Sequence, residues 1–418
     1  MARVVPFEAV HYNTHRFGQD LTRFVAPPYD VIDAVLERKL KEDRLNITYI
    51  TLGDEGDSYA TAAKRLRRWR NDEVLVKDEG RRFYLYEQMF QGPDGRPTVR
   101  SGLVGLVRLE EFSKGIVLPH EKTMPKHKAD RMALMQAVEG DTEQIFMLYE
   151  DPTGEMERIL GEARKRGELL RFIDTEGVHH RIIPIEDQAT VARMTALLEP
   201  AKLLIADGHH RYETSLEYRD RARGGRTEGD LPCDYVMTTL VSSGNPGLIV
   251  LPTHRLVKGL DDGRMRALEA RLRERFDAEE HGDADGLARA VERSPAGSFG
   301  AWMPAIGAAL LLRPRTGAGT AGPLDGLSVH VLQEQVLKPL LGYTDAMLDG
   351  KVDIDFVKGT GLAKAAMMAE DGFQACFFVK PPTVREVMAV AETGVKMPQK
   401  STYFYPKIWS GTLLHLFG

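Results

Sequence analysis

The sequence predicts an α/β protein built on a mixed sheet, and three observations support that prediction. Short apolar runs such as Ile145–Tyr149 have the length and composition of buried strands. Segments such as Tyr59–Trp69 lie between these runs and carry apolar residues at helical spacing. The chain has 418 residues, enough for more than one domain. We therefore expect two α/β domains, residues 1–257 and 258–418.

Composition and charge narrow the class of protein. The formal net charge is -5, which argues against a general nucleic-acid partner. No run approaches the ~20 apolar residues that a membrane span needs, so we expect no membrane partner. The start of the chain lacks a signal-peptide core, and Cys233 and Cys376 show no metal-ligand spacing. These features predict a cytoplasmic protein. A homo-oligomer remains an open alternative.

In the first hundred residues, a proline-fixed loop is the first candidate for a site. Pro27 and Pro28 hold the chain extended, so Tyr29 and Asp30 are expected to line a substrate site. The alternative is a plain turn in which Asp30 caps the following helix. Around this loop we predict, in order, a helix over Ala34–Lys41, a strand over Ile47–Leu52, a helix over Tyr59–Trp69, and a hairpin of Phe83–Gln91 with Thr98–Leu109.

A short apolar strand near residue 117 runs into a loop rich in charged groups. Glu121 is the natural general base there, because a carboxylate beside a hydroxyl takes its proton. Lys122 and Lys126 suit phosphate charge, and His120 is a candidate substrate contact. A helix is expected from Asp130, and polar groups at such strand ends often bind ligands in α/β proteins. The alternative is an exposed charged loop.

The central stretch combines a strand, a glycine turn and a helix. Leu203–Ala206 is apolar, Asp207 and Gly208 follow it, and from Arg211 the chain reads as a helix that stops at Gly224. Helix N-termini bind anions, and this turn adds one carboxylate, two imidazoles (His209 and His210) and one guanidinium. We expect a functional site here. The alternative is that Asp207 caps the helix and Arg211 pairs with a nearby acid.

Three further segments contain polar residues that could belong either to a site or to the structural framework. His179-His180-Arg181 lacks the glycine turn, and its side chains are expected to alternate on a structural strand over 177–184. His254 and Arg255 follow an apolar strand and are equally consistent with a site or a plain loop. In the C-terminal tail, Lys400, Ser401 and Thr402 are expected either to fold back over a site or to end the sheet as a terminal strand.

The remaining pattern predicts alternating helices and strands. In the first domain these are helices over Glu155–Leu170 and Ala189–Glu199 and strands over Asp234–Val241 and Leu248–Leu251. The second domain contains few candidate catalytic residues. Its expected elements are helices over Asp262–Arg275, Leu287–Arg293, Ser328–Leu341 and Leu362–Ala369, strands over Ser298–Met303, Ala308–Arg313 and Gln374–Val379, a Gly/Ala-rich loop over Thr316–Pro323, and a helix between Pro382 and Gly394.

Five segments together carry a resemblance over nearly the full length: Ala26–Ile32, Leu118–Lys128, Asp207–Thr214, Leu251–Leu256 and Lys400–Lys407. They resemble a widespread prokaryotic family of unknown function, distantly related to the ParB/sulfiredoxin fold. Within that fold, Asp207–Arg211 is similar to the phosphate-binding turn of free-serine kinases. Sulfiredoxin has its catalytic cysteine where this chain has His209, so thiol chemistry is not expected.

The resemblance implies a nucleotide phosphate at Gly208–Arg211, with Glu121 in the place of the base. The leading hypothesis is a small-molecule phosphotransferase that interconverts serine and phosphoserine with ADP or ATP and Mg²⁺, with Asp207 either holding the metal or orienting a histidine. Its partners would be a nucleotide and a small hydroxyl- or phosphate-bearing metabolite. One alternative is a nucleotide-binding regulator or ParB-like DNA-associated protein. The other is a metal hydrolase with His120, Asp207, His209 and His210 as ligands.

Overall fold

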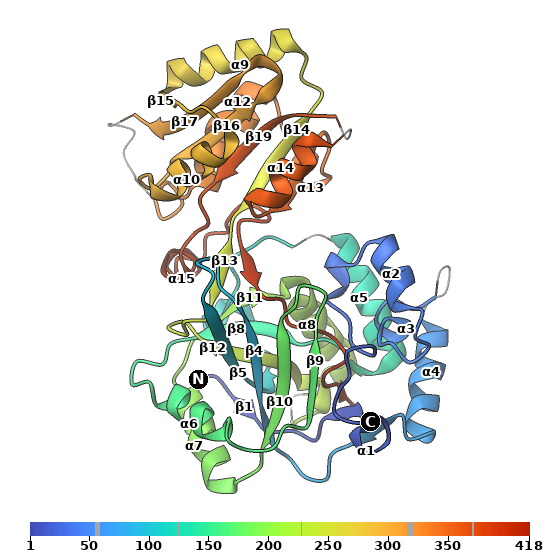
Figure 1. Cartoon of the computed structure of the whole chain (residues 1–418). Helices are drawn as coiled ribbons and strands as arrows, with labels where there is room; N and C mark the ends of the chain where they lie inside the picture. The colour runs from blue at the N-terminus through green and yellow to red at the C-terminus, as the bar shows by residue number, and fades with distance from the viewer. Residues whose placement is uncertain (55–58, 124, 227, 316–321, 370–371) are drawn as a thin grey trace. The chain divides into compact units, whose positions relative to one another are not determined.

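The computed structural model describes residues 1–54, 59–123, 125–226, 228–315, 322–369 and 372–418. It forms two compact units (Figure 1). Unit 1 comprises residues 1–119, 123–249 and 406–418, and unit 2 comprises residues 120–122 and 250–405. The expected division at residue 257 into two domains with separate roles stays a prediction. No helix among the described residues is long and apolar enough to cross a membrane.

Unit 1 is organised around a nine-stranded mixed sheet, as the sequence predicts. The path of hydrogen-bonded strands is β6 (Val117–Leu118), β11 (Leu203–Asp207), β8 (Ile145–Tyr149), β12 (Tyr235–Ser242), β5 (Pro97–Arg108), β4 (Phe83–Gln91), β10 (His179–Ile185) and β9 (Leu170–Ile173), with β1 (Val4–Val5) beside β5. β11 runs parallel to β6 and antiparallel to β8. The carboxyl end of β11 therefore lies beside the start of β8.

Helices and short ladders complete unit 1. The helices are α1 (Thr14–Phe17), α2 (Ala34–Leu40), α3 (Thr48–Thr51), α4 (Ala60–Asn71), α5 (Pro125–Val138), α6 (Glu155–Ala163), α7 (Gln188–Leu198) and α8 (His209–Arg223), with short 3-10 turns η1 (Tyr29–Val31), η2 (Phe112–Lys114) and η3 (Pro232–Asp234). Two small ladders pair β2 (Val10–Tyr12) with β3 (Leu75–Lys77), and β7 (Gly140–Asp141) with β21 (His415–Leu416).

The two faces of the unit 1 sheet are covered differently. Alternate strand residues such as Met147 and Ile205 pack in one apolar cluster with α6, α7 and Leu216 of α8. Elsewhere on the sheet, polar side chains are held by the C-terminal segment: Gln88 donates to the carbonyl of Lys407 at 2.7 Å, and buried Arg100 donates to the carbonyl of Pro406. The last residues of the chain are therefore part of the core of unit 1.

Unit 2 is a six-stranded antiparallel sheet between two layers of helices. Its strand order is β15 (Phe276–Glu280), β17 (Ala308–Pro314), β16 (Phe299–Met303), β19 (Phe373–Val379), β14 (Thr253–Lys258) and β18 (Ile354–Lys358). The helical segments are α9 (Asp262–Arg275), α10 (Ala284–Arg293), α11 (Ser328–Leu332), a π-helical turn η5 (Gln333–Leu337), α12 (Lys338–Leu341), α13 (Asp345–Asp349), α14 (Thr360–Met368) and α15 (Val384–Glu392), with a 3-10 turn η4 (Pro304–Ile306). β13 (Ile249–Leu251) pairs with β20 (Tyr403–Tyr405).

Strand alternation explains the layers of unit 2. Leu310 and Leu312 of β17 pack with α9 and α11, whereas Ala309 and Leu311 pack with α10 and α14. Both faces are thus buried, which fits the nearly continuous apolar run in β17.

Several sequence predictions are corrected by the structure. The expected strand Ile47–Leu52 is the short helix α3, because the Asn46 side chain accepts hydrogen bonds from the Thr48 amide and hydroxyl at 3.0 and 2.8 Å and starts a turn. Asp33, and not Asp30, caps α2. α6 ends at Ala163, earlier than expected, and residues 170–173 form β9. Residues 316–321 of the expected loop lie outside the described residues.

Candidate functional site

Gly208 makes the sharp turn between β11 and α8. Its φ of 96° and ψ of 27° lie in the left-handed region that a Cβ resists. A Cβ at this position would also lie 3.1 Å from a terminal nitrogen of the Arg211 guanidinium. The backbone conformation and this close packing therefore both favour glycine. The turn places the N-terminus of a 15-residue helix directly after the strand, with the buried His209 and the half-buried His210 in its first turn.

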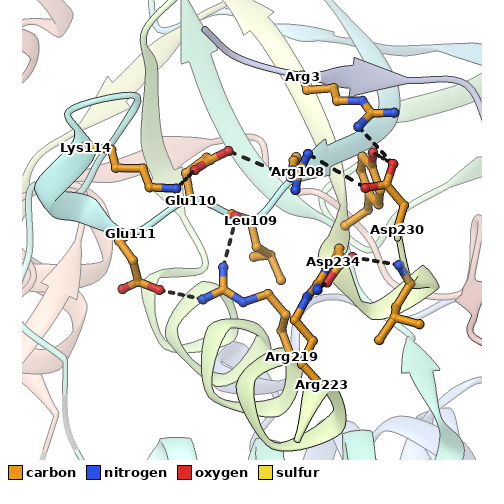
Figure 2. Close-up of polar contacts among 12 residues, drawn as sticks. Arg3, Arg108, Leu109, Glu110, Glu111, Lys114, Arg219, Arg223, Asp230 and Asp234 are labelled. Atoms are coloured by element: carbon orange, nitrogen blue, oxygen red, sulfur yellow. Dashed lines mark hydrogen bonds and ion pairs between the residues drawn. The ribbon is translucent and has the colours of Figure 1, made fainter. Parts of the chain in front are cut away.

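The far half of α8 is fixed by a polar network (Figure 2). Arg219 donates to the carbonyl of Leu109 at 3.0 Å and pairs with Glu111 at 2.5 Å. Arg223 forms two hydrogen bonds with Asp234, at 2.6 and 2.5 Å. These contacts tie the helix to the ends of β5 and β12, so its N-terminus is presented by a rigid support.

Asp207 is held between two cations. Its Oδ1 accepts from Lys407 Nζ at 2.7 Å, and its Oδ2 accepts from Arg211 Nη2 at 2.9 Å. The exposed fractions of these three side chains are only 22% for Asp207, 12% for Lys407 and 11% for Arg211. Arg211 also donates to the carbonyl of Gln144 at 2.5 Å. This group of three side chains, here named the Asp207 clamp, carries one net positive charge beside the helix N-terminus.

The proline loop meets the same region within unit 1. The Tyr29 amide donates to Glu143 Oε1 at 3.1 Å, and the Arg131 guanidinium lies 4.0 Å from the centre of the Tyr29 ring. Burial opposes the charged form of Arg211, but Glu143, Asp207 and Asp30 together hold its pKa above the ordinary value. Asp30 is exposed and close enough to act on Arg211. The two segments that the sequence singled out, 26–32 and 207–211, are therefore brought together.

Glu143 is the buried carboxylate that organises this region. It accepts from Ser410 Oγ at 2.9 Å as well as from the Tyr29 amide, and its Oε2 lies 3.5 Å from Arg131 Nη1. Burial disfavours the charged form of Arg131, but the neighbouring Glu143 raises the pKa of that guanidinium above its usual range. Such a buried, paired charge fixes geometry more than it adds stability.

A second polar group lies within unit 2. His120 is fully buried, and its Nε2 lies 2.9 Å from Thr402 Oγ1 and 3.9 Å from Glu121 Oε1. The Thr402 hydroxyl lies 3.3 Å from the same Glu121 oxygen, and the Met397 amide donates to the carbonyl of His120 at 2.8 Å. Glu121 thus belongs to unit 2 and Asp207 to unit 1, and their expected sharing of one site stays a prediction.

His254 and Arg255 are interior residues of β14. The Val379 amide donates to His254 Nδ1 at 3.2 Å, and Nε2 lies 3.2 Å from Thr360 Oγ1. Burial, aided by Arg255, lowers the pKa of His254 to about 3, so the ring is neutral. Arg255 donates to the carbonyls of Gln399 and Lys400 at 3.1 and 3.2 Å. These contacts support the tail, and a substrate role for either residue stays a prediction.

The other predicted residues have simpler surroundings. Ser401 is buried and donates to the carbonyl of Pro398, whereas Lys400 is exposed with a left-handed φ of 53°. Lys122 is exposed, and the side chain of Lys126 lies outside the described residues. In the second His-His-Arg segment, His180 is buried, stacks on Phe172 at 4.1 Å and lies 3.1 Å from Asp174, while His179 is exposed. The predicted alternation of that segment is confirmed.

A divalent cation such as Mg²⁺ requires several oxygen ligands. Within the described part of the chain, no group of three or more His, Cys, Asp or Glu side chains is placed to hold a metal ion. Both Asp207 oxygens already accept hydrogen bonds from cationic side chains. The arrangement therefore does not fit Mg²⁺ held by Asp207, since a hard cation needs several free oxygens.

Sequence reasoning missed three residues of the unit 1 region: Arg131, Glu143 and Lys407. Lys407 lies in the polar and aromatic tail that drew attention, and it is the tail residue that contacts the turn in unit 1. Arg131 and Glu143 carry no local signal, because their role depends on contacts with Tyr29, which is distant in the sequence.

The matching family model is a protein family of unknown function, DUF1015, and it matches residues 4–330. The chain belongs to this family, as the resemblance in the sequence predicted. No curated protein matched the sequence. Solved structures share the mixed α/β character at low similarity. A free serine kinase in complex with AMP has 15% identity, covers 69% of this chain and 83% of its own, and has a TM-score of 0.37.

Two other solved structures are similar to the same degree. A conserved hypothetical protein from Pyrococcus furiosus has 16% identity, 70% and 89% coverage of this chain and its own, and a TM-score of 0.36. SbnI with C-terminal truncation from Staphylococcus aureus has 11% identity, 73% and 84% coverage, and a TM-score of 0.36. At this level the similarity carries no argument about what this chain binds.

Proposed function

We propose that unit 1 binds the phosphates of ADP or ATP at the Gly208–Arg211 turn and that the chain transfers a phosphoryl group to or from a small hydroxyl metabolite. The observation that carries the proposal is the turn itself. A long helix starts at a left-handed glycine that supplies no capping side chain, beside the two cations of the Asp207 clamp. Backbone amides and a helix dipole at such an end favour an anion.

Arg211 and Lys407 have positioning roles in this proposal. Because both cations already contact Asp207, they fix the turn and contribute positive potential without having to leave their partners. The amides of the first turn of α8, with His210, make the direct phosphate contacts. Any Mg²⁺ is expected to arrive with the nucleotide, and no step here depends on a metal held by Asp207.

Two carboxylates are candidates for accepting the proton of the hydroxyl. Asp30 is supported by its exposure and by its electrostatic influence on Arg211 within unit 1. Glu121, expected from the sequence, is supported by its contact with the Thr402 hydroxyl in unit 2. Either carboxylate is the chemical type that removes a hydroxyl proton during transfer.

A transfer assay tests the proposal and separates the two carboxylates. Wild-type protein is incubated with ADP or ATP and a panel of small hydroxyl metabolites that includes serine, and the phosphorylated metabolite and the nucleotide product are both measured. We expect turnover in the wild type and a loss of about 10²–10⁴-fold in kcat in either Asp30→Asn or Glu121→Gln. The exposed Asp72→Asn serves as the matched control and should keep full activity. Absence of transfer to every hydroxyl acceptor tried, with nucleotide bound, would reject the proposal.

A further inference from the structure

Unit 1 contains an open pocket of about 870 Å³ that the proposed phosphate site does not use. This volume falls in the range of about 300–1,000 Å³ that is typical of small-molecule sites. It is much larger than a three-carbon amino acid such as serine would fill. The described residues that line it come from η1, α2, the segment after α3, the start of α4 and the middle of α5: Tyr29, Ala34, Glu37, Arg38, Lys41, Leu52, Gly53, Asp54, Tyr59, Asp130 and Arg131.

The wall of this pocket contains a strained residue. Tyr59 has φ of 62°, a left-handed value that is rare for an aromatic side chain. Its hydroxyl donates to Asp130 Oδ1 at 2.9 Å and accepts from Arg131 Nη2 at 2.9 Å. Its ring packs closely on Gly53, where a Cβ would lie 3.1 Å from the nearest ring atom. Strain of this kind persists where the surroundings hold it in place, and it is concentrated at ligand sites.

The charged side chains that line the pocket differ in whether they form ion pairs. Glu37 pairs with Lys41 at 2.6 Å, Asp130 with Arg131 at 2.6 Å, and Asp54 with Arg65 at 3.3 Å. These paired carboxylates keep spare lone pairs that accept hydrogen bonds from hydroxyl groups. Arg38 is exposed on α2 and has no ion pair with any residue in the described part of the chain. It is therefore the cation that an anionic group entering the pocket would meet.

Two of the lining residues connect the pocket to the phosphate turn. Tyr29 and Arg131 both line it, and both contact Glu143. Glu143 in turn acts on Arg211 of the Asp207 clamp. A ligand in the pocket would thus contact Tyr29 and Arg131, which are linked through Glu143 to Arg211 of the phosphate turn.

We propose that this pocket binds a polyhydroxylated metabolite with an anionic group, a sugar phosphate or a sugar acid, with the anion at Arg38 and the hydroxyls at the paired carboxylates. The assignment of this ligand as the phosphoryl acceptor rests on the proposed function, whereas its binding does not. The acceptor of this chain is accordingly larger than free serine.

Isothermal titration of the full chain with D-ribose 5-phosphate, D-gluconate and L-serine tests the proposal. We expect the sugar phosphate or the sugar acid to bind, and the stronger of the two identifies the anion. Arg38→Gln should weaken that binding about tenfold, while Lys39→Gln, an exposed neighbour on α2 outside the pocket, should leave it unchanged. No heat with either sugar, equal affinity in Arg38→Gln, or binding of serine alone would overturn it.

A parallel titration with ADP separates this proposal from the proposed function. Arg38-dependent sugar binding without ADP binding would keep the pocket assignment and reject phosphoryl transfer. ADP binding without sugar binding would do the reverse.

Discussion

The Asp207 clamp makes a quantitative prediction about stability. In Asp207→Asn the carboxylate is lost, and Arg211 and Lys407, both nearly buried, keep their charges without it. Breaking a buried ion pair by removing one partner costs about 3–5 kcal/mol. Because Asp207 is 22% exposed and Arg211 keeps its bond to the Gln144 carbonyl, we expect the lower end, about 3 kcal/mol.

The pairing itself is measured by a double-mutant cycle. Lys407→Met leaves Asp207 bonded to Arg211, so its cost should be smaller, about 1–2 kcal/mol. The double variant should be less destabilised than the sum of the single variants by at least about 1 kcal/mol. Unfolding by urea, followed by circular dichroism, gives these free energies.

The matched control is Asp220→Asn on the same helix. Asp220 pairs with Arg219 at 2.7 Å, but its side chain is 62% exposed, so the loss should stay within about 1 kcal/mol. A cost below about 1 kcal/mol for Asp207→Asn, or additive single variants, would refute the reasoning that the clamp holds the turn.

Three further predictions concern the glycine turn, a buried histidine and a buried cysteine. Gly208→Ala should destabilise the protein by about 1–3 kcal/mol, because of the positive φ and the adjacent Arg211. The control Gly161→Ala, inside α6 with open space around it, should stabilise the protein by about 0.5–1 kcal/mol. Equal shifts in melting temperature for the two variants would contradict this. In the folded protein His254 stays neutral, because its pKa is lowered to about 3 from an ordinary 6.5. Between these two pH values only the unfolded chain binds the proton. The free energy of unfolding therefore falls as the pH drops from about 6.5 towards 3, by up to about 1.4 kcal/mol per pH unit. Urea unfolding at several pH values should show this slope, and it should flatten in His254→Gln; an unchanged slope would count against it. Burial raises the pKa of Cys376, so a thiol reagent should label Cys376 only after unfolding, and rapid labelling of the native protein would show that the site opens.

The sequence predicted those elements of the fold whose signal is local. The Leu203–Arg223 strand, turn and helix, the hairpin of β4 and β5, and α9 all have strong periodicity with clear start or stop residues. Residues 48–51 were wrongly predicted to belong to a strand and form a helix. Their β-branched pattern favours a strand, but the Asn46 side chain and packing override it.

The candidate site was predictable in part for a related reason. Asp207, Gly208 and Arg211 stand together in the sequence, so their contacts are local. Lys407 and Asp207 are 200 residues apart in the sequence, and a contact between such distant residues leaves no periodic pattern in either segment. Pairings of this kind require the topology of the sheet, which single-sequence patterns do not contain.

Calorimetric titration of ADP and ATP into the wild type, His210→Ala and His179→Ala tests phosphate binding at the Gly208–Arg211 turn. His210 lies in the first turn of α8, and His179 is the exposed histidine of the other His-His-Arg segment, on β10. We expect the wild type and His179→Ala to bind, and His210→Ala to lose at least about tenfold in affinity, equivalent to about 1.4 kcal/mol. No nucleotide binding by the wild type, or equal affinity in His210→Ala, would contradict phosphate binding at this turn.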